Sequence, residues 1–287
     1  MRIDLQLHST YSDGYLSPTQ LAKFMKRHDV EVAAVTDHNT VGGIEEFKIA
    51  CSKLGIKAIP GIELYVKLKS VKFNLLWYNF DDTSPEFHKM LRDSQMRRRK
   101  QIRSILLKLV DSGFKLEVEK ILDKFTHYVP INKVVDALMS IPANEKKVKK
   151  ELQNPAPTEG EIIKEYFNNP NYGFLINSYI NVERVLKLRK KIGGQLVVCH
   201  PGKHNKAKRD FLEKLRMLGV DGVELLSPHH TYGSVIHIQR MAREFDFIET
   251  GGSDFHRFEG DKMPLQHSWE YFHIRSRYLR GVKKIIG

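Results

Sequence analysis

Short β-branched runs that alternate with amphipathic helical patterns constrain the fold of this chain more than any other feature of its sequence. A strand, a helix and a second strand in that order form a parallel pair with a helical crossover, so the sequence predicts a parallel α/β sheet. Strand-like runs are expected at residues 3–8, 32–36, 57–60, 72–78, 195–199, 222–226 and 247–250, and helical patterns at 18–27, 44–54, 181–191, 208–218 and 235–244. Six or seven strands in this order fit a small, distorted barrel.

A different pattern interrupts the alternation after Pro85. One long amphipathic helix is predicted over residues 86–112, and shorter helical pieces follow it. Residues 141–160 hold three prolines and four lysines and are predicted to form an exposed connection. The expected organisation is a barrel made of residues 1–97 and 181–287, with residues 98–180 as a helical insertion.

The size and composition of the chain favour a folded protein without a membrane segment. With 287 residues and 41% hydrophobic content it can bury a large core, as one barrel-sized domain or one domain with an insertion. No apolar run approaches the roughly 18 residues needed to cross a bilayer. Met1 leads directly into the first strand-like run, which leaves no room for a signal peptide. A cytoplasmic protein is therefore expected.

The charge distribution indicates an anionic partner. The net charge is +13, and residues 97–191 contain 20 Lys and Arg against 11 Asp and Glu, so +9 of the excess lies in this third of the chain. Clustered basic side chains attract phosphates and gain affinity by releasing counterions. Cys51 and Cys199 are too few for a disulfide framework and lack Cys-x-x-Cys spacing, so both are predicted to be buried thiols.

Candidate metal ligands lie in widely separated segments, each beside a strand-like run. They are His8, Asp13, His38, Glu63, His200, Asp254 and His256. Carboxylates mixed with imidazoles are the donor set for Mn, Zn or Fe, and buried carboxylates are costly without a partner. Ligands at successive strand ends would meet at one rim of a barrel, where such folds keep their chemistry.

The segments that carry these residues resemble the successive motifs of the PHP (polymerase and histidinol phosphatase) metal-dependent phosphoesterases. The six motifs are Asp4-Leu5-Gln6-Leu7-His8-Ser9, Tyr11-Ser12-Asp13-Gly14, Thr36-Asp37-His38-Asn39, Pro60-Gly61-Ile62-Glu63, Cys199-His200-Pro201-Gly202 and Gly252-Ser253-Asp254-Phe255-His256. The resemblance runs over nearly the whole chain. It implies a distorted (β/α)7 TIM-like barrel, and the helical insertion is typical of the branch that removes phosphate from nucleotides or trims RNA from its 5′ end.

The resemblance also implies three metal sites, in which Glu63 bridges two ions and Asp254 is a further catalytic carboxylate. The first site would use Gln6, His8, Glu63 and Asp254, the second Glu63, Asn74 and His200, and the third Asp13, His38 and His256. Gln6 and Asn74 stand where the family pattern has histidine. An amide oxygen still coordinates hard cations, but it is a poorer donor for zinc than imidazole, so two to three ions with a preference for Mn or Mg over Zn or Fe are expected.

Substrate contacts are predicted at the start of the helical insertion and in the barrel segment after His200. Arg97 and Arg98 could pair with phosphate oxygens through their planar guanidinium groups, and Lys203 and His204 follow the His-Pro-Gly turn. His229 and His230 follow another strand end. One of them is predicted to donate to a substrate oxygen or to act as a general acid.

Two functions from different classes fit these observations. The first is a phosphoesterase that hydrolyses a nucleotide or the 5′ end of short RNA with metal-activated water. The second is a weakened or inactive relative that binds nucleotides or nucleic acid. Histidinol phosphate is a third substrate of the same reaction class, for which the basic insertion offers no reason. The partner is thus a phosphorylated small molecule, nucleotide or short nucleic acid and no membrane, and the sequence leaves the oligomeric state open.

Gln6→His tests whether the amide weakens its site. If Gln6 occupies a ligand position, an imidazole there should raise both the metal content of the purified protein and its turnover, because imidazole is the stronger donor. Metal analysis by mass spectrometry and a phosphate-release assay measure the two effects. Unchanged stoichiometry and rate would mean that Gln6 is an adequate ligand or no ligand.

Overall fold

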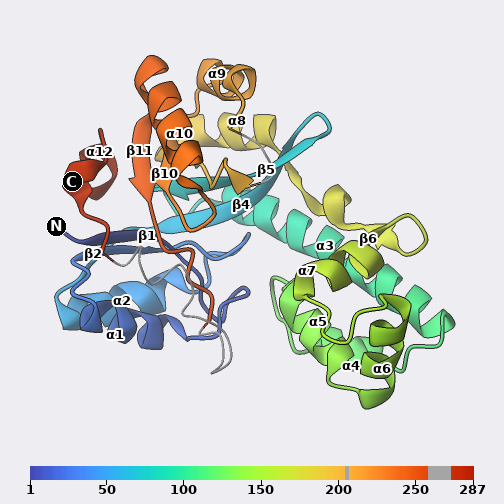
Figure 1. Ribbon diagram of the computed structural model, residues 1–287. Coiled ribbons are helices and arrows are strands. Elements are labelled where there is room, and N and C mark those ends of the chain that lie inside the picture. Colours follow the sequence, from blue (N-terminus) through green and yellow to red (C-terminus); the bar gives the residue numbers. More distant parts are fainter. Residues whose placement is uncertain (204–206, 258–272) are drawn as a thin grey trace. The chain divides into compact units, whose positions relative to one another are not determined.

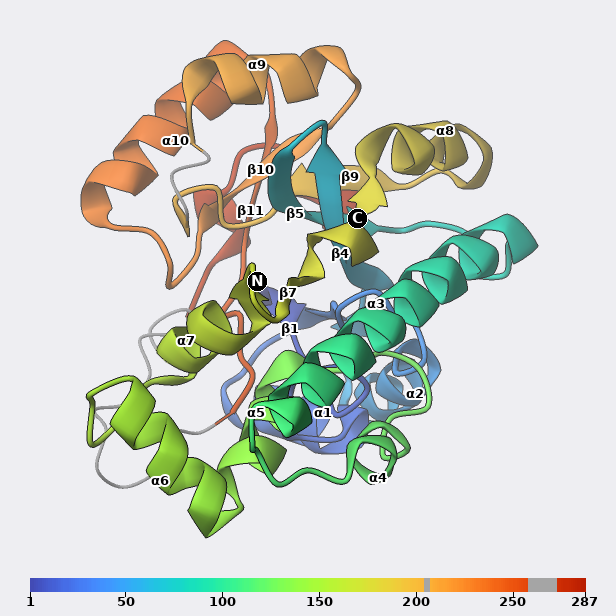
Figure 2. The same ribbon diagram turned by 90° about the vertical axis from the view of Figure 1, so that its right-hand side faces the viewer.

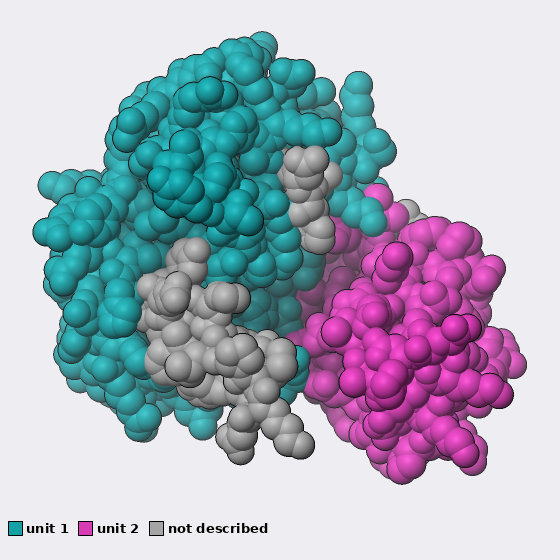
Figure 3. Space-filling model, viewed as in Figure 1, with its two compact units in different colours: residues 1–88, 180–287 teal, residues 89–179 magenta. Residues whose placement is uncertain are grey.

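The computed structural model describes residues 1–203, 207–257 and 273–287, and it divides into two compact units. Unit 1 comprises Met1–His88 and Ile180–Gly287, and unit 2 comprises Lys89–Tyr179 (Figure 3). The division at Lys89 falls inside the long helix α3, Pro85–Asp111, and lies nine residues before the boundary expected at residue 98. The second division, after Tyr179, falls one residue from the boundary expected at residue 180.

Unit 1 contains two sheets with helices beside them. A three-stranded parallel sheet has the order β1-β2-β3, and a six-stranded sheet has the order β11-β10-β9-β5-β4-β8. The strands are β1 (Ile3–Leu7), β2 (Val32–Val35), β3 (Lys57–Ala58), β4 (Gly61–Leu68), β5 (Val71–Tyr78), β8 (Ile180–Asn181), β9 (Gln195–Val198), β10 (Gly222–Leu226) and β11 (Ile248–Gly251). The helices are α1 (Pro18–Arg27), α2 (Ile44–Leu54), α8 (Val182–Ile192), α9 (Arg209–Met217), α10 (Tyr232–Glu244) and the short α12 (Lys283–Ile286), with one 3-10 turn, η4 (Ser276–Tyr278).

The helices begin and end where the sequence provides capping groups. Ser17 caps α1 through a capping box with Gln20, and Gly55 ends α2 in the left-handed conformation at φ 69°. Both helices lie against the three-stranded sheet, whereas α8, α9 and α10 accompany the six-stranded one (Figures 1 and 2). The α/β class expected from the sequence is therefore confirmed.

The hairpin of β4 and β5 is the main departure from the expected parallel sheet. The two strands pair antiparallel from Gly61 opposite Tyr78 to Leu68 opposite Val71, and β5 also pairs antiparallel with β9. The expectation of an all-parallel sheet is therefore wrong at β5. The sequence does not predict β4 as a strand, because the charged residues Lys67 and Lys69 near its end obscure the apolar alternation.

Isolated bridges connect the edges of the two sheets. Leu7 forms a parallel bridge with Phe255, and His38 forms one with Glu63. These bridges bring β1 to the end of β11 and β2 to the start of β4. The strands of the described residues do not form one continuous ladder, so the structure has no closed barrel.

Buried strands and a few large aromatic side chains form the core of unit 1. Every residue of β1, β2 and β11 is buried, which is typical of strands covered on both faces. Trp77 and Tyr78 are fully buried, and each satisfies its polar atom. Trp77 Nε1 donates to the Gly193 carbonyl, and Tyr78 Oη donates to the Leu5 carbonyl.

Unit 2 is helical and has its own core. Besides the part of α3 within it, it contains α4 (Val118–Leu122), α5 (Ile131–Met139), α6 (Pro142–Glu151), α7 (Glu159–Ile162), the π-helical η1 (Ile163–Phe167), the 3-10 turn η2 (Leu175–Ser178) and the short antiparallel pair β6 (Asn168–Asn169) and β7 (Gly173–Phe174). Leu106, Leu138 and Phe167 are fully buried in one cluster. The exposed connection expected over residues 141–160 is wrong for residues 142–151, because its lysines belong to α6, where Lys147 and Lys149 pair with glutamates one turn away, whereas residues 152–158 are irregular.

Among the residues that the structure describes, no helix is both long enough and apolar enough to cross a membrane.

Gly252→Ala should destabilise the protein, because the backbone of β1 passes directly over this glycine. A Cβ there would lie 2.5 Å from the Gln6 nitrogen and 2.6 Å from the Gln6 Cβ. Overpacking of this kind costs about 1–3 kcal/mol. Gly233→Ala is the control within the same unit, since its added Cβ meets no atom closer than 4.0 Å. Denaturant titration of both variants checks the difference, and equal midpoints would contradict it.

Candidate metal centre

The ends of the strands bring the predicted ligands together. His8 follows β1, His38 follows β2, and His200 follows β9 by one residue. Asp254 and His256 follow β11. Glu63 is different, because it is the third residue of β4 and reaches the others through the bridge between its own backbone and His38. The expectation that each ligand lies at a C-terminal strand end is therefore wrong for Glu63.

Three groups of side chains can each hold a cation. In every group one ligand atom per residue lies within 4.8 Å of the others. The groups are His8 with Asp13, His38 and His256; His8 with Glu63 and Asp254; and Glu63 with Cys199 and His200. His8 and Glu63 each belong to two groups, so the three form one continuous cluster.

The shortest distances in the cluster are centred on Glu63. Its Oε2 lies 3.1 Å from His8 Nε2, and its Oε1 lies 3.3 Å from His200 Nε2. His8 Nε2 is also 3.1 Å from Asp254 Oδ1. Asp13 contacts three imidazoles, at 3.4 Å from Nε2 of His38, 3.4 Å from Nε2 of His256 and 3.5 Å from Nδ1 of His8.

Mutual electrostatics hold these groups in opposite charge states. Burial alone would raise the pKa of Glu63, but His38, His200 and His8 outweigh it and hold that pKa well below its usual range. Asp254 behaves in the same way through His256, His229 and His8. Burial would lower the pKa of His8, yet Asp254, Glu63 and Asp13 raise it well above the ordinary value. The low pKa values of Glu63 and Asp254 favour the ionised form of both carboxylates in a buried site.

Buried polar atoms without hydrogen bonds indicate that a cation fits the cluster. His8 is fully buried, and neither of its ring nitrogens has hydrogen-bond geometry, although Nε2 lies between Glu63 and Asp254. The Oε1 atom of the fully buried Gln6 also has no partner. Buried groups of this kind are costly, and a divalent ion between Glu63 and Asp254 would satisfy Nε2 of His8 and both carboxylates at once. The donor set therefore fits a metal.

The two amides predicted as substitute ligands point at Glu63. Gln6 Nε2 donates to Glu63 Oε2 at 3.1 Å, and Asn74 Nδ2 donates to Glu63 Oε1 at 2.5 Å. Asn74 lies in the middle of β5, on the strand that pairs antiparallel with β4. In this arrangement the amides donate hydrogen bonds to the carboxylate through their N–H groups, and coordination would require each amide to turn its oxygen inward.

Asp37 supports the loop that carries Asp13. Its carboxylate accepts from the Ser9 nitrogen at 2.7 Å, from Ser9 Oγ at 2.6 Å and from Ser12 Oγ at 2.5 Å. Its position next to His38 in the sequence would suit an acceptor that orients that imidazole. Its hydrogen bonds instead fix the turn of residues 9–12, and through it the position of Asp13.

The structure adds three buried residues that the sequence does not single out as site residues. Cys199 lies in a metal-binding group, with Sγ 3.3 Å from Glu63 Oε1. Glu224 is fully buried on β10 and accepts from the His200 nitrogen at 2.7 Å. Asp4 is fully buried and accepts from the Ser253 nitrogen, and burial raises its pKa to about 7. A carboxylate inside a strand motif was the available signal for Asp4, whereas Glu224 had none.

His229 and Lys203 form a polar edge beside Asp254. His229 Nε2 lies 2.6 Å from Asp254 Oδ2, and Lys203 Nζ lies 3.3 Å from the same ring nitrogen. The His229 side chain is 30% exposed. Burial, with the charge of Lys203, lowers the pKa of His229 although Asp254 opposes it. A partly accessible imidazole between a cation and a carboxylate suits proton transfer.

His230 has a structural role, in contrast to the predicted substrate contact. Its Nδ1 donates to the Leu225 carbonyl at 2.9 Å, and its Nε2 accepts from the Gly202 nitrogen at 3.1 Å. Burial lowers its pKa to about 4. Gly202 is needed at this contact, because a Cβ there would lie 2.5 Å from the ring. With both nitrogens in use, His230 ties the His200-Pro201-Gly202 turn to the end of β10.

The other predicted substrate contacts belong to unit 2 or lie outside the described residues. Arg98 is buried in unit 2, where Nε donates to the Val129 carbonyl and the guanidinium lies over the Tyr128 ring. A phosphate contact by Arg98 is therefore wrong, since the side chain holds α3 to its neighbours. Arg97 is exposed on α3 of unit 2. His204 lies outside the described residues.

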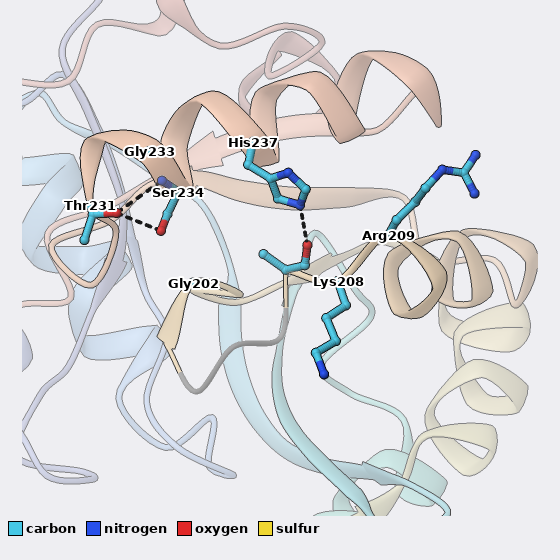
Figure 4. Close-up of a pocket in the computed structure, with 8 residues that line it drawn as sticks. Gly202, Lys208, Arg209, Thr231, Gly233, Ser234 and His237 are labelled. Carbon is cyan, nitrogen blue, oxygen red and sulfur yellow. Dashed lines mark hydrogen bonds between the residues drawn. The ribbon is translucent and has the colours of Figure 1, made fainter.

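A pocket of about 590 Å³ opens beside the His200-Pro201-Gly202 turn (Figure 4). It is lined by Gly202, Ala207, Lys208, Arg209, Thr231, Gly233, Ser234 and His237. His237 donates to the Ala207 carbonyl, and Thr231 caps α10 by accepting from the Ser234 nitrogen. Arg209 and Lys208 are both exposed, and Arg209 pairs with Glu213 and Glu244.

Comparisons with known proteins give the family and the fold. The model of the PHP domain matches residues 4–168, more than half of the chain. A 5′-3′ exoribonuclease of Haemophilus influenzae is 28% identical over 260 residues, which are 89% of this chain and 90% of that protein. A phosphoribosyl 1,2-cyclic phosphate 1,2-diphosphodiesterase of Eggerthella lenta is 25% identical, over 88% of this chain and 93% of that one. A solved structure from Bifidobacterium adolescentis, a candidate metal-dependent phosphoesterase, has a TM-score of 0.73 at 19% identity and covers 92% of this chain and 90% of its own.

Divalent ions should raise the melting temperature of this protein, and Glu63→Gln should remove most of that rise. At about 100 times its Kd an ion stabilises the folded state by about 2.7 kcal/mol, which is roughly 5–10 °C for a chain of this size. Glu63→Gln keeps the side-chain shape but removes the charge shared by two groups. Thermal scans with added Mn²⁺ or Zn²⁺ and with chelator measure the shift.

Glu249→Gln is the matched control for this measurement. Glu249 is a buried glutamate on β11 that accepts from the Arg280 nitrogen and belongs to none of the three groups. Its variant should keep the full metal-induced shift. An equal loss in both variants would contradict the assignment of Glu63.

Proposed function

The chain belongs to the PHP domain family, and from this premise we propose that it is a metal-dependent phosphoesterase acting on nucleotides or on the 5′ ends of short RNA. The observation that carries the proposal is the buried cluster in which Glu63 and Asp254 stay ionised beside His8, whose ring nitrogens lack hydrogen bonds. Burying such ionised groups without a bound cation costs free energy, and a cation among them offsets that cost. Membership of the family, the cluster and the two enzyme relatives all favour catalysis.

The three groups supply the ligand positions of this proposal. His8, Glu63 and Asp254 hold the first position, Glu63 with His200 holds the second, and Asp13, His38 and His256 hold the third with His8 beside them. Gln6 and Asn74 join the first and second if their amides turn. Two to three ions are expected, with Mn favoured wherever the donors are imidazole, carboxylate and amide oxygen.

Divalent cations at such a centre supply Lewis acidity toward phosphoryl oxygens and activate water near neutral pH. The residues of the chain provide the rest. Glu63 is fixed by the bridge between β2 and β4, so its two oxygens can serve neighbouring ligand positions. His229 Nε2 lies 2.6 Å from Asp254 Oδ2. We assign the imidazolium form of His229 the transfer of one proton to the leaving oxygen, which leaves a neutral ring, with Lys203 beside it as a positive charge for the phosphate.

The substrate class follows from the names of the relatives and from charge. Both relatives act on a phosphoryl group attached to ribose, one in RNA and one in a phosphoribosyl cyclic phosphate. The net charge of +13 suits a polyanionic substrate. The pocket beside Gly202, with Lys208 in its lining, is the place proposed for the part of the substrate beyond the reacting phosphate. Arg97 and His204 remain candidate phosphate contacts.

The alternative is a catalytically silent protein that binds nucleotides or nucleic acid. Gln6 and Asn74 are its only motivation within the cluster. It is less well supported, because all three carboxylates and four imidazoles of the centre are present and close together. A distorted (β/α)7 barrel and a cytoplasmic location stay predictions. The two bridges between the sheets support the first of these.

Purified protein should release phosphate or nucleotides from ribose phosphates only with a divalent metal. Candidate substrates are a 5′-phosphorylated oligoribonucleotide, a nucleoside bisphosphate and a nucleoside monophosphate, each tried with Mn, Mg, Zn and Fe. Asp254→Asn should lower kcat/KM by at least about 100-fold. Mutation of residues that only hydrogen-bond to metal ligands typically lowers activity about 10–100-fold, and loss of a ligand itself should cost more. Absence of hydrolysis in every combination would refute the proposal.

Asp246→Asn is the matched control for Asp254→Asn. Both aspartates have a left-handed backbone, with φ 52° at Asp246 and 50° at Asp254, which asparagine tolerates. Asp246 pairs with Arg280, outside the cluster. Full activity in Asp246→Asn separates a chemical effect at Asp254 from a backbone effect.

A further inference from the structure

We propose that Cys199 is a metal ligand, which supplies to the Glu63–His200 group a thiolate in place of the imidazoles that Gln6 and Asn74 cannot provide. The inference rests on the proposed function for the presence of a cation, but it concerns one residue that the family pattern does not assign. It also changes the expected metal at this group from Mn to Zn or Fe, because thiolates prefer softer ions.

The backbone explains how two adjacent residues can reach one site. Successive residues of a strand point to opposite faces, so Cys199 and His200 would normally diverge. His200, however, has φ 27°, a left-handed conformation that is uncommon outside glycine. The Glu224 carboxylate accepts from the His200 nitrogen at 2.7 Å and helps to hold this conformation. The kink ends the alternation immediately after β9, and the thiol and the imidazole both enter the group with Glu63.

The contacts of Cys199 are those of a site, not of an apolar core. The side chain is 2% exposed. Its Sγ lies 3.3 Å from Glu63 Oε1, 3.9 Å from Glu224 Oε2 and 3.0 Å from Gln6 Nε2. Cys51, by comparison, is buried within α2 and belongs to none of the three metal-binding groups. A thiol placed only to fill space has no need of two carboxylates beside it.

A second buried atom points to a ligand at this place. Gln6 is fully buried, its amide contacts both Cys199 and Glu63, and its Oε1 has no hydrogen-bond partner. A cation held by Glu63, His200 and Cys199 would allow the amide to turn and present this oxygen. If the Gln6 oxygen turns toward this group instead of toward the first position, four donors of mixed hardness surround one ion, which matches the coordination number of zinc. Binding releases the thiol proton to solvent, so the charge of the site changes by one unit less than that of the ion.

Cobalt spectroscopy of the full-length protein tests the proposal without relying on turnover. Co²⁺ bound to a thiolate gives an intense charge-transfer absorption in the near ultraviolet, whereas nitrogen and oxygen ligands alone do not. Cys51 and Cys199 are the two cysteines of the chain, so in Cys51→Ala any such band must come from Cys199. We expect the band in wild type and Cys51→Ala, and its loss in Cys199→Ala and Cys199→Ser. Cobalt bound to Cys51→Ala without the band overturns the proposal, even if the Cys199 variants fail to fold.

Metal affinity provides the second measurement. Cys199→Ala should weaken the tightest Zn²⁺ site by at least about tenfold, the lower end of the loss seen when even outer groups are removed. Cys51→Ala should leave Zn²⁺ affinity unchanged. Equal affinity in the two variants would overturn the inference.

Activity assays separate this inference from the proposed function. Metal-dependent hydrolysis without the thiolate band would refute the ligand role of Cys199 and leave the phosphoesterase proposal intact. A thiolate band without hydrolysis of any ribose phosphate would support the ligand role of Cys199 and refute the phosphoesterase proposal. Failure of the protein to bind Co²⁺ or Zn²⁺ at all would refute the ligand role of Cys199, and absence of hydrolysis with Mn, Mg, Zn and Fe would in addition refute the phosphoesterase proposal.

Discussion

The structure depends on keeping Glu63 and Asp254 ionised inside the protein. Removing a carboxylate from water is costly, and unpaired ones are normally protonated or absent from a core. Here His8, His200, His38 and His256 surround them, and the pKa values of both carboxylates stay well below their usual range. Since His8 contacts both carboxylates without hydrogen-bond geometry, its ring nitrogens stay unsatisfied beside the two buried acids. A cation is the simplest group that satisfies Nε2 of this ring and both acids.

The fold serves this cluster by bringing together residues that are distant in sequence. Strand ends deliver His8, His38 and His200, as parallel α/β sheets generally do. Glu63 arrives by another route, through the β4–β5 hairpin and its bridge to His38. The hairpin also carries Asn74 to the same carboxylate. The first strand of this hairpin therefore gives the centre its central ligand, while the second strand, β5, runs antiparallel to both of its neighbours.

The amides and the thiol change the character of the centre rather than remove it. Gln6 and Asn74 are neutral and, as placed, donate N–H groups to Glu63. Cys199 lies beside Gln6 and Glu63. Its thiolate is a soft donor that favours Zn or Fe, whereas amide oxygens favour harder ions such as Mn or Mg. Selectivity among divalent metals depends on donor softness more than on the number of ligands. Two neighbouring positions in one cluster can thus prefer different ions.

Sequence alone determined the class of fold, most of the element boundaries of unit 1 and the set of candidate ligands. Apolar periodicity and capping residues act locally, so they can be recognised without the tertiary structure. Carboxylates and histidines that recur beside strand-like runs are costly to bury unless they bind a cation, and this cost made the ligands recognisable. Sequence missed β4 and the helix α6, where charged residues obscure the apolar pattern.

Tertiary structure alone decided which of those side chains meet and what each one does. Arg98 and His230 looked like phosphate contacts, but packing uses their polar atoms for backbone carbonyls and amides. Glu224 and Cys199 carried no clear signal in the sequence, because a lone acid or thiol in a strand is usually structural. They became part of the site only because the left-handed turn at His200 and the pairing of β9 with β10 place them beside Glu63 and His200, and such placement depends on contacts between segments far apart in the chain.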